Sequence, residues 1–199
     1  MSIKYGGKEM ESILKASVSG SAADRMARAS KEYGETPIND LDMLNGINVE
    51  GHAVYGQANC KVASRVVQMG TTSVTGDFRH EVGHALHGVA ESAHGPLVKA
   101  MRHEYDAAME RAKANPAGMQ QKLSHQWYEE NYGVIGRRAL DTWHENVAEH
   151  YRGYHKAIYQ QRHEGNAAAL STYRQRHSGW AKIWDAWYTG ALIAQEGQK

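Results

Sequence analysis

The sequence predicts an α+β domain that is predominantly α-helical, with a small sheet ahead of a helix over residues 77–93. Apolar residues recur at helical spacing in most segments after residue 77. Before that point, valines between glycines give residues 47–69 strand character. No repeat, low-complexity tract or linker divides the 199 residues, and a chain of this length can bury a core. We therefore expect a single domain over residues 1–199.

The N-terminal segment, residues 1–45, is expected to be helical. Met10, Ile13, Leu14 and Val18 fall near helical spacing inside a predicted helix over residues 8–33. The pattern breaks around Pro37. The strand-like residues 47–69 follow, and a turn-rich connector, GTTSVTG, occupies residues 70–76. The part of the chain that carries the motifs then extends over about residues 47–164.

Helix boundaries are predicted from capping residues and prolines. Asp77 suits the N-cap of a helix that runs to about Ala93 and is stopped by Gly95-Pro96. Pro96 suits the first turn of the next helix, which reaches Asn115-Pro116. Two further helices are predicted over about residues 118–131 and 141–163.

The C-terminal segment, residues 166–199, is rich in tryptophan. All 5 tryptophans of the chain lie after residue 126, and Trp180, Trp184 and Trp187 are spaced i, i+4 and i+7. This spacing predicts a buried face on a helix over about residues 166–195. Much of the core is therefore expected in the C-terminal half.

Charge and cysteine content exclude several classes of protein. Lys and Arg number 23 against 22 Asp and Glu, so the net charge of +1 gives no basis for capturing nucleic acid or anionic membrane. Cys60 is the only cysteine, and no intrachain disulfide can form. The first 20 residues lack the apolar stretch of a signal peptide, and no segment approaches membrane-spanning length. We expect synthesis as a soluble cytoplasmic protein.

The stretch GDFRHEVGHALHG, residues 76–88, holds the strongest chemical signal. His80 and His84 are four apart, so their side chains project from one helix face, one turn above the other. This spacing lets two imidazoles bind one tetrahedral Zn²⁺, with Glu81 beside the open position as a general base. The motif predicts a zinc site that needs a third protein ligand.

His87 is not expected to be that ligand. Three residues at i, i+4 and i+7 span about 10 Å of helix axis, too far to converge on one ion. In the three-histidine variant of the motif, a glycine and then a histidine stand at the positions of His87 and Ala90, so that variant is excluded. The third ligand is then expected to be a glutamate from a later helix.

Glu145 is preferred for this position over Glu104. Glu145 and Glu149 form an i, i+4 pair in DTWHENVAEHY. One carboxylate could bind the metal while the second orients a histidine ligand through its outer N–H. The sequence Thr142-x-x-Glu145 also reads as a capping box, which would use the same carboxylate. Glu104 remains the alternative ligand.

Together these segments resemble a known family. FRHEVGHALHG and ENVAEHY look like the gluzincins, zinc metallopeptidases with an HExxH motif and a glutamate ligand, and in particular like anthrax-lethal-factor-like catalytic domains of toxins and phage-associated proteins. That family carries a HExGHxL-type helix, a Tyr-Gly or Tyr-Ala pair and a Glu-x-x-Ala-Glu helix. HEVGHAL (80–86), Tyr132-Gly133 and residues 145–149 stand in these places. The likeness covers about residues 60–155.

The resemblance implies a zincin-like fold and a role for each residue. His80, His84 and Glu145 would bind zinc, Glu81 would be the base, Tyr132 would stabilise the oxyanion, and Glu149 would support the ligands from behind. Other residues near the predicted Glu145 helix could donate a hydrogen bond to the oxyanion in place of Tyr132. In chain order they are Arg137, Arg138, His150, Tyr151, Tyr154 and His155.

The expected activity is hydrolysis of peptide bonds in a protein or peptide substrate. A further partner protein is expected in a virion or in a toxin complex. Two other functions compete with the peptidase. The first is a structural or assembly protein, for example of a virus particle, that keeps the fold and the metal with little turnover. The second is a metal-binding interaction module. The intact Glu81 favours the enzyme, because a structural zinc site does not require that glutamate.

Overall fold

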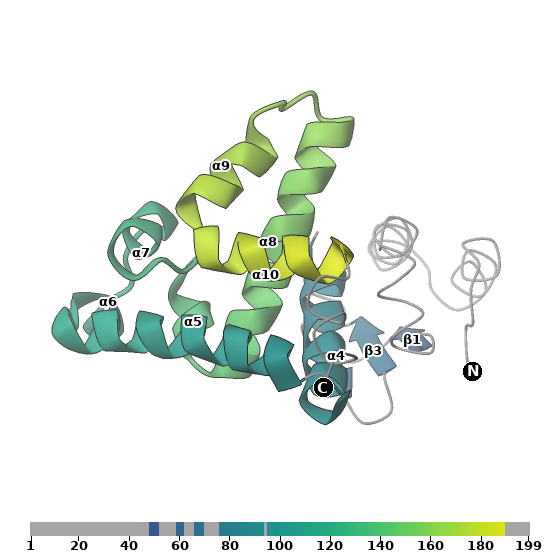
Figure 1. The fold of residues 1–199 in the computed structure, drawn as a ribbon, viewed down its shortest axis with the longest axis horizontal. Helices are drawn as coiled ribbons and strands as arrows, with labels where there is room; N and C mark the ends of the chain where they lie inside the picture. The colour runs from purple at the N-terminus through teal and green to yellow at the C-terminus, as the bar shows by residue number, and fades with distance from the viewer. Residues whose placement is uncertain (1–47, 52–58, 62–65, 70–75, 94, 190–199) are drawn as a thin grey trace. The chain divides into compact units, whose positions relative to one another are not determined.

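The computed structural model describes residues 48–51, 59–61, 66–69, 76–93 and 95–189 (Figure 1). These residues are mostly helical, as the sequence predicts. The chain divides into two compact units, Met1–Val89 and Ala90–Lys199. The predicted helix over residues 8–33 lies outside the described residues, as does the end of the predicted tail helix after residue 189. The single domain over residues 1–199 stays a prediction.

The first unit contains a three-stranded sheet. Its strands are β1 (Asn48–Gly51), β2 (Asn59–Lys61) and β3 (Val66–Met69), in the order β1-β3-β2. β1 runs parallel to β3 and pairs Val49 with Val67, whereas β2 runs antiparallel and pairs Cys60 with Val67. Val67 is therefore the centre of the sheet, and its side chain is fully buried.

Helix α4 (Asp77–Ala93) begins and ends where the sequence predicts a helix. Its start differs in one detail: Asp77 is the first helical residue, and Gly76 precedes it with a φ of 93°. Glycine adopts this left-handed conformation without a steric penalty, and its carbonyl accepts the His80 N–H at 3.0 Å. Asp77 then places a negative charge in the first turn, where the helix dipole favours it.

Within its described residues, the second unit contains helices joined by short loops (Figure 1). It comprises α5 (Gly95–Ala114), α6 (Ala117–Gln120), α7 (His125–Tyr132), the 3₁₀ helix η2 (Arg137–Leu140), α8 (Trp143–His163), α9 (Ala169–Arg176) and α10 (Ser178–Thr189). Within this unit α10 contacts α5, α8 and α9, and η2 packs against the long helix α8. The predicted helices over 95–115 and 141–163 are present as α5 and α8.

Two predicted helices are each split in the structure. The helix predicted over residues 118–131 is wrong as a single element, because Gln121 is extended and Ser124 begins a new helix, α7. The Ser124 hydroxyl accepts the Trp127 N–H at 3.2 Å, which is the usual bond of an N-cap serine. The predicted tail helix is likewise interrupted at His177, whose φ and ψ of −127° and 52° end α9.

One core cluster of the second unit joins α5, α7 and η2. Its buried members are Ala108, Ala112, Tyr128, Tyr132, Val134, Ala139 and Leu140. Gly118 of α6 lies beneath the aromatic rings at one side of this cluster. A Cβ at Gly118 would stand 2.6 Å from Trp127, 2.7 Å from Tyr132 and 2.8 Å from Tyr128, so only glycine fits there.

A second group of aromatic rings lies between α8, α9 and α10. Trp180, Trp184 and Trp187 are 2%, 1% and 7% exposed, which confirms the buried face predicted for this helix. The His150 ring is fully buried and stacks on Trp180, with ring centroids 4.7 Å apart and planes 8° from parallel. Tyr173 closes this group, since its hydroxyl donates to the His150 carbonyl at 3.1 Å.

Candidate metal centre on α4

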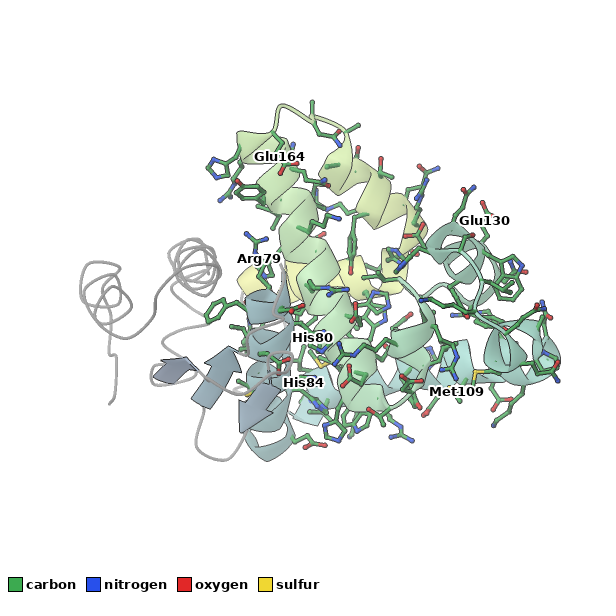
Figure 2. The ribbon with its side chains drawn as sticks, turned by 180° about the vertical axis from the view of Figure 1, so that it is seen from behind. Arg79, His80, His84, Met109, Glu130 and Glu164 are labelled. Atoms are coloured by element: carbon green, nitrogen blue, oxygen red, sulfur yellow. The ribbon has the colours of Figure 1, made fainter. Side chains whose placement is uncertain are left out.

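The two histidines of the HEVGH motif lie side by side on α4 (Figure 2). The Nε2 atoms of His80 and His84 are 3.1 Å apart. Their rings meet edge to face, with centroids 4.7 Å apart and an interplanar angle of 87°. His80 is 1% exposed and His84 is half-buried. The helix therefore places two imidazole nitrogens at one point of the first unit, as the spacing predicts.

This separation fits a shared metal ion. Two nitrogens bound to one tetrahedral Zn²⁺ at about 2.0–2.1 Å are separated by roughly 3.3 Å. The observed 3.1 Å is close to that value. A hydrogen bond between two neutral imidazoles also gives such a distance, with one ring as the donor. Because the pair satisfies both geometries, a small side-chain movement suffices to exchange a shared proton for a shared metal.

Glu81 follows His80 directly on α4 and is 4% exposed. Its negative charge is felt by Cys60 of β2, in the same unit. Burial, and after it the charge of Glu81, raises the pKa of the Cys60 thiol to about 12. Cys60 therefore stays protonated at neutral pH and is poorly suited to bind a metal as thiolate or to act as a nucleophile.

His87 is fully buried on α4. It lies three residues beyond His84, on the same helix. Glu91, by contrast, is exposed.

Glu145 and Glu149 both lie on α8, in the second unit. The Thr142 hydroxyl accepts the Glu145 N–H at 3.2 Å, so Thr142 is the N-cap that the capping-box pattern predicts. The Glu145 carboxylate itself pairs with Arg138 of η2, at 2.8 Å from Oε2 to Nε. The backbone of Glu145 thus serves the cap, while its half-buried carboxylate is held by an arginine.

Glu149 is 4% exposed and pairs with Arg152, one turn further along α8, at 2.6 Å. A buried carboxylate needs such a partner, because an isolated charge is expensive to remove from water. Convergence of His80, His84 and Glu145 on one ion, and support from Glu149, stay predictions.

Glu104, the alternative ligand, lies on α5 with its carboxyl group against the first turn of α10. A Cβ at Gly179 would stand 2.2 Å from the Glu104 carboxyl carbon and from both of its oxygens. The carboxylate therefore occupies the space that a side chain at Gly179 would need. A negative charge beside the N-terminus of α10 is also favoured by the helix dipole. These contacts explain Glu104 by packing within the second unit.

Tyr132 is enclosed in the core of the second unit, with a fully buried side chain. Its hydroxyl donates to the Asn115 carbonyl and accepts the Gly118 N–H at 3.0 Å. To stabilise an oxyanion, this hydroxyl would have to leave both backbone partners. The geometry therefore explains Tyr132 as a residue that closes the turn between α5 and α6.

The other residues predicted as possible donors to the oxyanion have separate contacts within the second unit. His150 faces Tyr173, with 3.3 Å from its Nδ1 to the hydroxyl, and Tyr154 donates to Asp185 at 2.6 Å. Tyr151 packs against His155, with ring centroids 4.3 Å apart.

Arg138, a further member of this set, pairs with the predicted ligand Glu145. The sequence offers Arg138 only as one of several possible donors. The useful signal was the short interval from Arg138 to the Thr142 N-cap, which places both at the start of α8.

No family model, curated protein or solved structure matches this chain. Among the described residues, no helix is long and apolar enough to cross a membrane.

Proposed function

We propose that this chain is a zinc-dependent metallopeptidase of the gluzincin type, with a zincin-like α+β fold. The observation that carries the proposal is the pair of Nε2 atoms of His80 and His84, 3.1 Å apart, on the helix that also bears the buried Glu81. Two converging imidazoles supply two of the three protein ligands of a catalytic zinc site, and the adjacent carboxylate supplies its general base. The substrate class is a protein or peptide, and a virion or toxin complex is the proposed setting.

The proposed ligands are His80, His84 and Glu145, with Glu149 as the supporting carboxylate. Zn²⁺ suits this donor set, because it binds neutral imidazole and carboxylate in tetrahedral sites that keep one position open. When bound, the ion would lower the pKa of a water molecule to about 7 and polarise the scissile carbonyl. The protein supplies the remaining groups.

Glu81 is the proposed general base. Its carboxylate would take the proton from the attacking water and later deliver it to the leaving amine. Its low exposure, 4%, keeps bulk water from competing for that proton. For the oxyanion we favour a donor other than Tyr132, because the Tyr132 hydroxyl bonds the backbone at Asn115 and Gly118.

Glu81→Gln is the central test. It is expected to keep zinc and to lower cleavage of a casein or mixed-peptide substrate by roughly 10²–10⁴-fold, the usual contribution of a general base. Glu110→Gln is the control, since Glu110 is an exposed glutamate on α5 that belongs to no group of possible metal ligands. Zinc content by elemental analysis and cleavage by mass spectrometry provide the two readouts.

Three results would contradict this proposal. Zinc in the wild type without cleavage of any substrate favours the structural or assembly protein. Equal activity in Glu81→Gln removes Glu81 from the mechanism. Unchanged zinc content in His80→Ala removes the metal site itself.

The third ligand requires separate variants. Glu145→Gln is expected to weaken zinc binding at least tenfold, whereas Glu104→Gln leaves it unchanged. Arg138→Gln removes the ion pair but keeps the Glu145 carboxylate, so it distinguishes loss of the ligand from loss of its partner. Zinc loss in Glu104→Gln alone would assign the position to Glu104.

A further inference from the structure

Two adjoining cavities open on the second unit between the segment that joins α6 to α7 and the 3₁₀ helix η2. Their volumes are about 350 and 330 Å³, and both are lined by Lys122, Arg137 and Asp141. Volumes of this size suit a few side chains of a bound ligand. Because they share three lining residues, we treat them as one binding surface, called the η2 pocket.

The charges that line the η2 pocket are mainly positive. Lys122, Arg137 and Arg138 contribute three cations, against the single carboxylate of Asp141. Arg137 pairs with Asp141 and Arg138 with Glu145. Lys122 makes no ion pair within the described part of the chain. Since the whole protein carries a net charge of only +1, this concentration of cations is local.

The floor of the η2 pocket is apolar. Leu123 is half-buried, and the Tyr128 ring is buried beneath it. The Tyr128 hydroxyl is turned away to the carbonyls of Gly118 and Gln121, at 2.9 and 3.2 Å, so the pocket receives the ring face or edge. A cationic rim over an apolar floor matches an acidic residue flanked by apolar ones.

The wall of the η2 pocket is fixed by close packing. His125 Nδ1 lies 2.7 Å from the Ile135 carbonyl, and its ring covers Gly136. A Cβ at Gly136 would stand 2.8 Å from His125 Nδ1, so the glycine permits this approach. The start of α7 is thereby held against the residues that lead into η2. The cations therefore project from a preorganised frame.

We propose that the η2 pocket binds an acidic peptide segment through its Asp or Glu carboxylates. This inference rests on the proposed function, for which it names the substrate class: peptides with an acidic residue near the scissile bond. Arg138 connects the two, because it lines the pocket and also pairs with Glu145, the proposed ligand, at 2.8 Å. A nucleic acid fits less well, because affinity for phosphate backbones requires cations spread over many contacts.

Binding can be measured without cleavage by using the full chain with Glu81→Gln. The probe is a fluorescein-labelled peptide with two glutamates between apolar residues, compared with the same peptide carrying glutamines. Fluorescence anisotropy is expected to show roughly fivefold to tenfold tighter binding of the glutamate peptide at low salt, falling as salt is added.

Lys122→Glu and Arg137→Glu should each remove most of that preference. Lys156→Glu is the matched control, since Lys156 is an exposed lysine on α8 that does not line the pocket. Circular dichroism checks that each variant is folded. Inorganic phosphate serves as a competitor and is expected to compete weakly, because it cannot contact the apolar floor.

The proposal is overturned if both peptides bind equally, or if Lys122→Glu and Lys156→Glu behave alike. It is also overturned if phosphate alone displaces the probe at concentrations similar to those of the glutamate peptide. Selective binding of the glutamate peptide with no cleavage by the wild type would keep the η2 pocket and reject the peptidase. Cleavage by the wild type without a preference for the glutamate peptide would keep the peptidase and reject the η2 pocket.

Discussion

Helices α4 and α8 each bury two histidines and one glutamate, but the polar contacts along the two helices differ. On α8 the polar groups find partners of opposite character: Glu145 pairs with Arg138, Glu149 with Arg152, and His150 faces the Tyr173 hydroxyl. On α4, His80 and His84 meet nitrogen to nitrogen, where only one neutral ring can donate.

This difference separates a structural arrangement from one that favours a shared cation. Polar groups that pair with opposite charges need nothing more to be stable. Two imidazole nitrogens that face each other can share one proton or bind one metal ion between them. The proposed metal site therefore begins from the histidine pair on α4, whereas these contacts of the α8 side chains are explained by packing within the second unit.

The largest expected effect is the stabilisation of the folded protein by zinc bound at the α4 histidines. A ligand that binds only the folded state at a thousandfold excess over its Kd stabilises a protein by about 4 kcal/mol. We expect zinc to raise the thermal midpoint of the wild type and not that of His84→Ala. His103→Ala, which changes an exposed histidine on α5, is the control. A similar zinc shift in His84→Ala would place the metal elsewhere.

Gly118→Ala should damage the second unit by overpacking. The added methyl would stand within 2.8 Å of the rings of Trp127, Tyr132 and Tyr128. We expect a loss of about 1–3 kcal/mol in the free energy of unfolding, measured in urea. Zinc bound by the folded protein should keep its stoichiometry. Gly165→Ala is the comparison, because no atom lies within 4 Å of the added Cβ, although its φ of 69° carries a strain of its own.

Tyr132→Phe tests whether the Tyr132 hydroxyl is structural or catalytic. Removing it leaves the Gly118 N–H and the Asn115 carbonyl without this partner, at a cost of about 1–2 kcal/mol in unfolding free energy. Under the structural role, kcat of the folded variant changes little. A fall in kcat of a hundredfold or more with unchanged stability would restore Tyr132 as the oxyanion donor.

Acid should destabilise the second unit through its buried histidines. Burial, and then the nearby His177, holds the pKa of His150 well below its ordinary value, and burial also lowers the pKa of His177 despite Glu129. A depressed histidine pKa means that the unfolded state binds protons more readily. Stability is therefore complete above the unfolded pKa of about 6.5 and falls as the pH drops towards the folded pKa.

The slope of the unfolding free energy against pH measures this effect. Each such histidine contributes at most about 1.4 kcal/mol per pH unit below 6.5. Urea unfolding between pH 7 and pH 5 should show a shallower slope for His150→Phe, which keeps a ring against Trp180. His163→Phe, at an exposed position near the end of α8, is the control. Equal slopes in His150→Phe and wild type would refute this role.

The local parts of the structure could be predicted from the sequence. The bounds of α4 follow from Asp77 and from Gly95-Pro96. The one-face placement of His80 and His84 and the buried tryptophan face of α10 follow from helical periodicity. Periodicity depends only on neighbours within about two turns, so the sequence contains it directly. The helices α5 and α8 were likewise indicated by pattern and capping residues.

The contacts of the polar side chains are known only from the tertiary structure. The Tyr132 hydroxyl closes a turn of backbone, Glu104 occupies the space above Gly179, and Arg138 reaches Glu145. These contacts join residues whose proximity depends on how separate helices pack, which spacing along the chain does not specify. The sequence by itself thus determined the histidine pair of the proposed metal site. The packing of the second unit decided that Arg138 pairs with Glu145, the glutamate proposed to complete the site, and that the Tyr132 hydroxyl bonds the backbone.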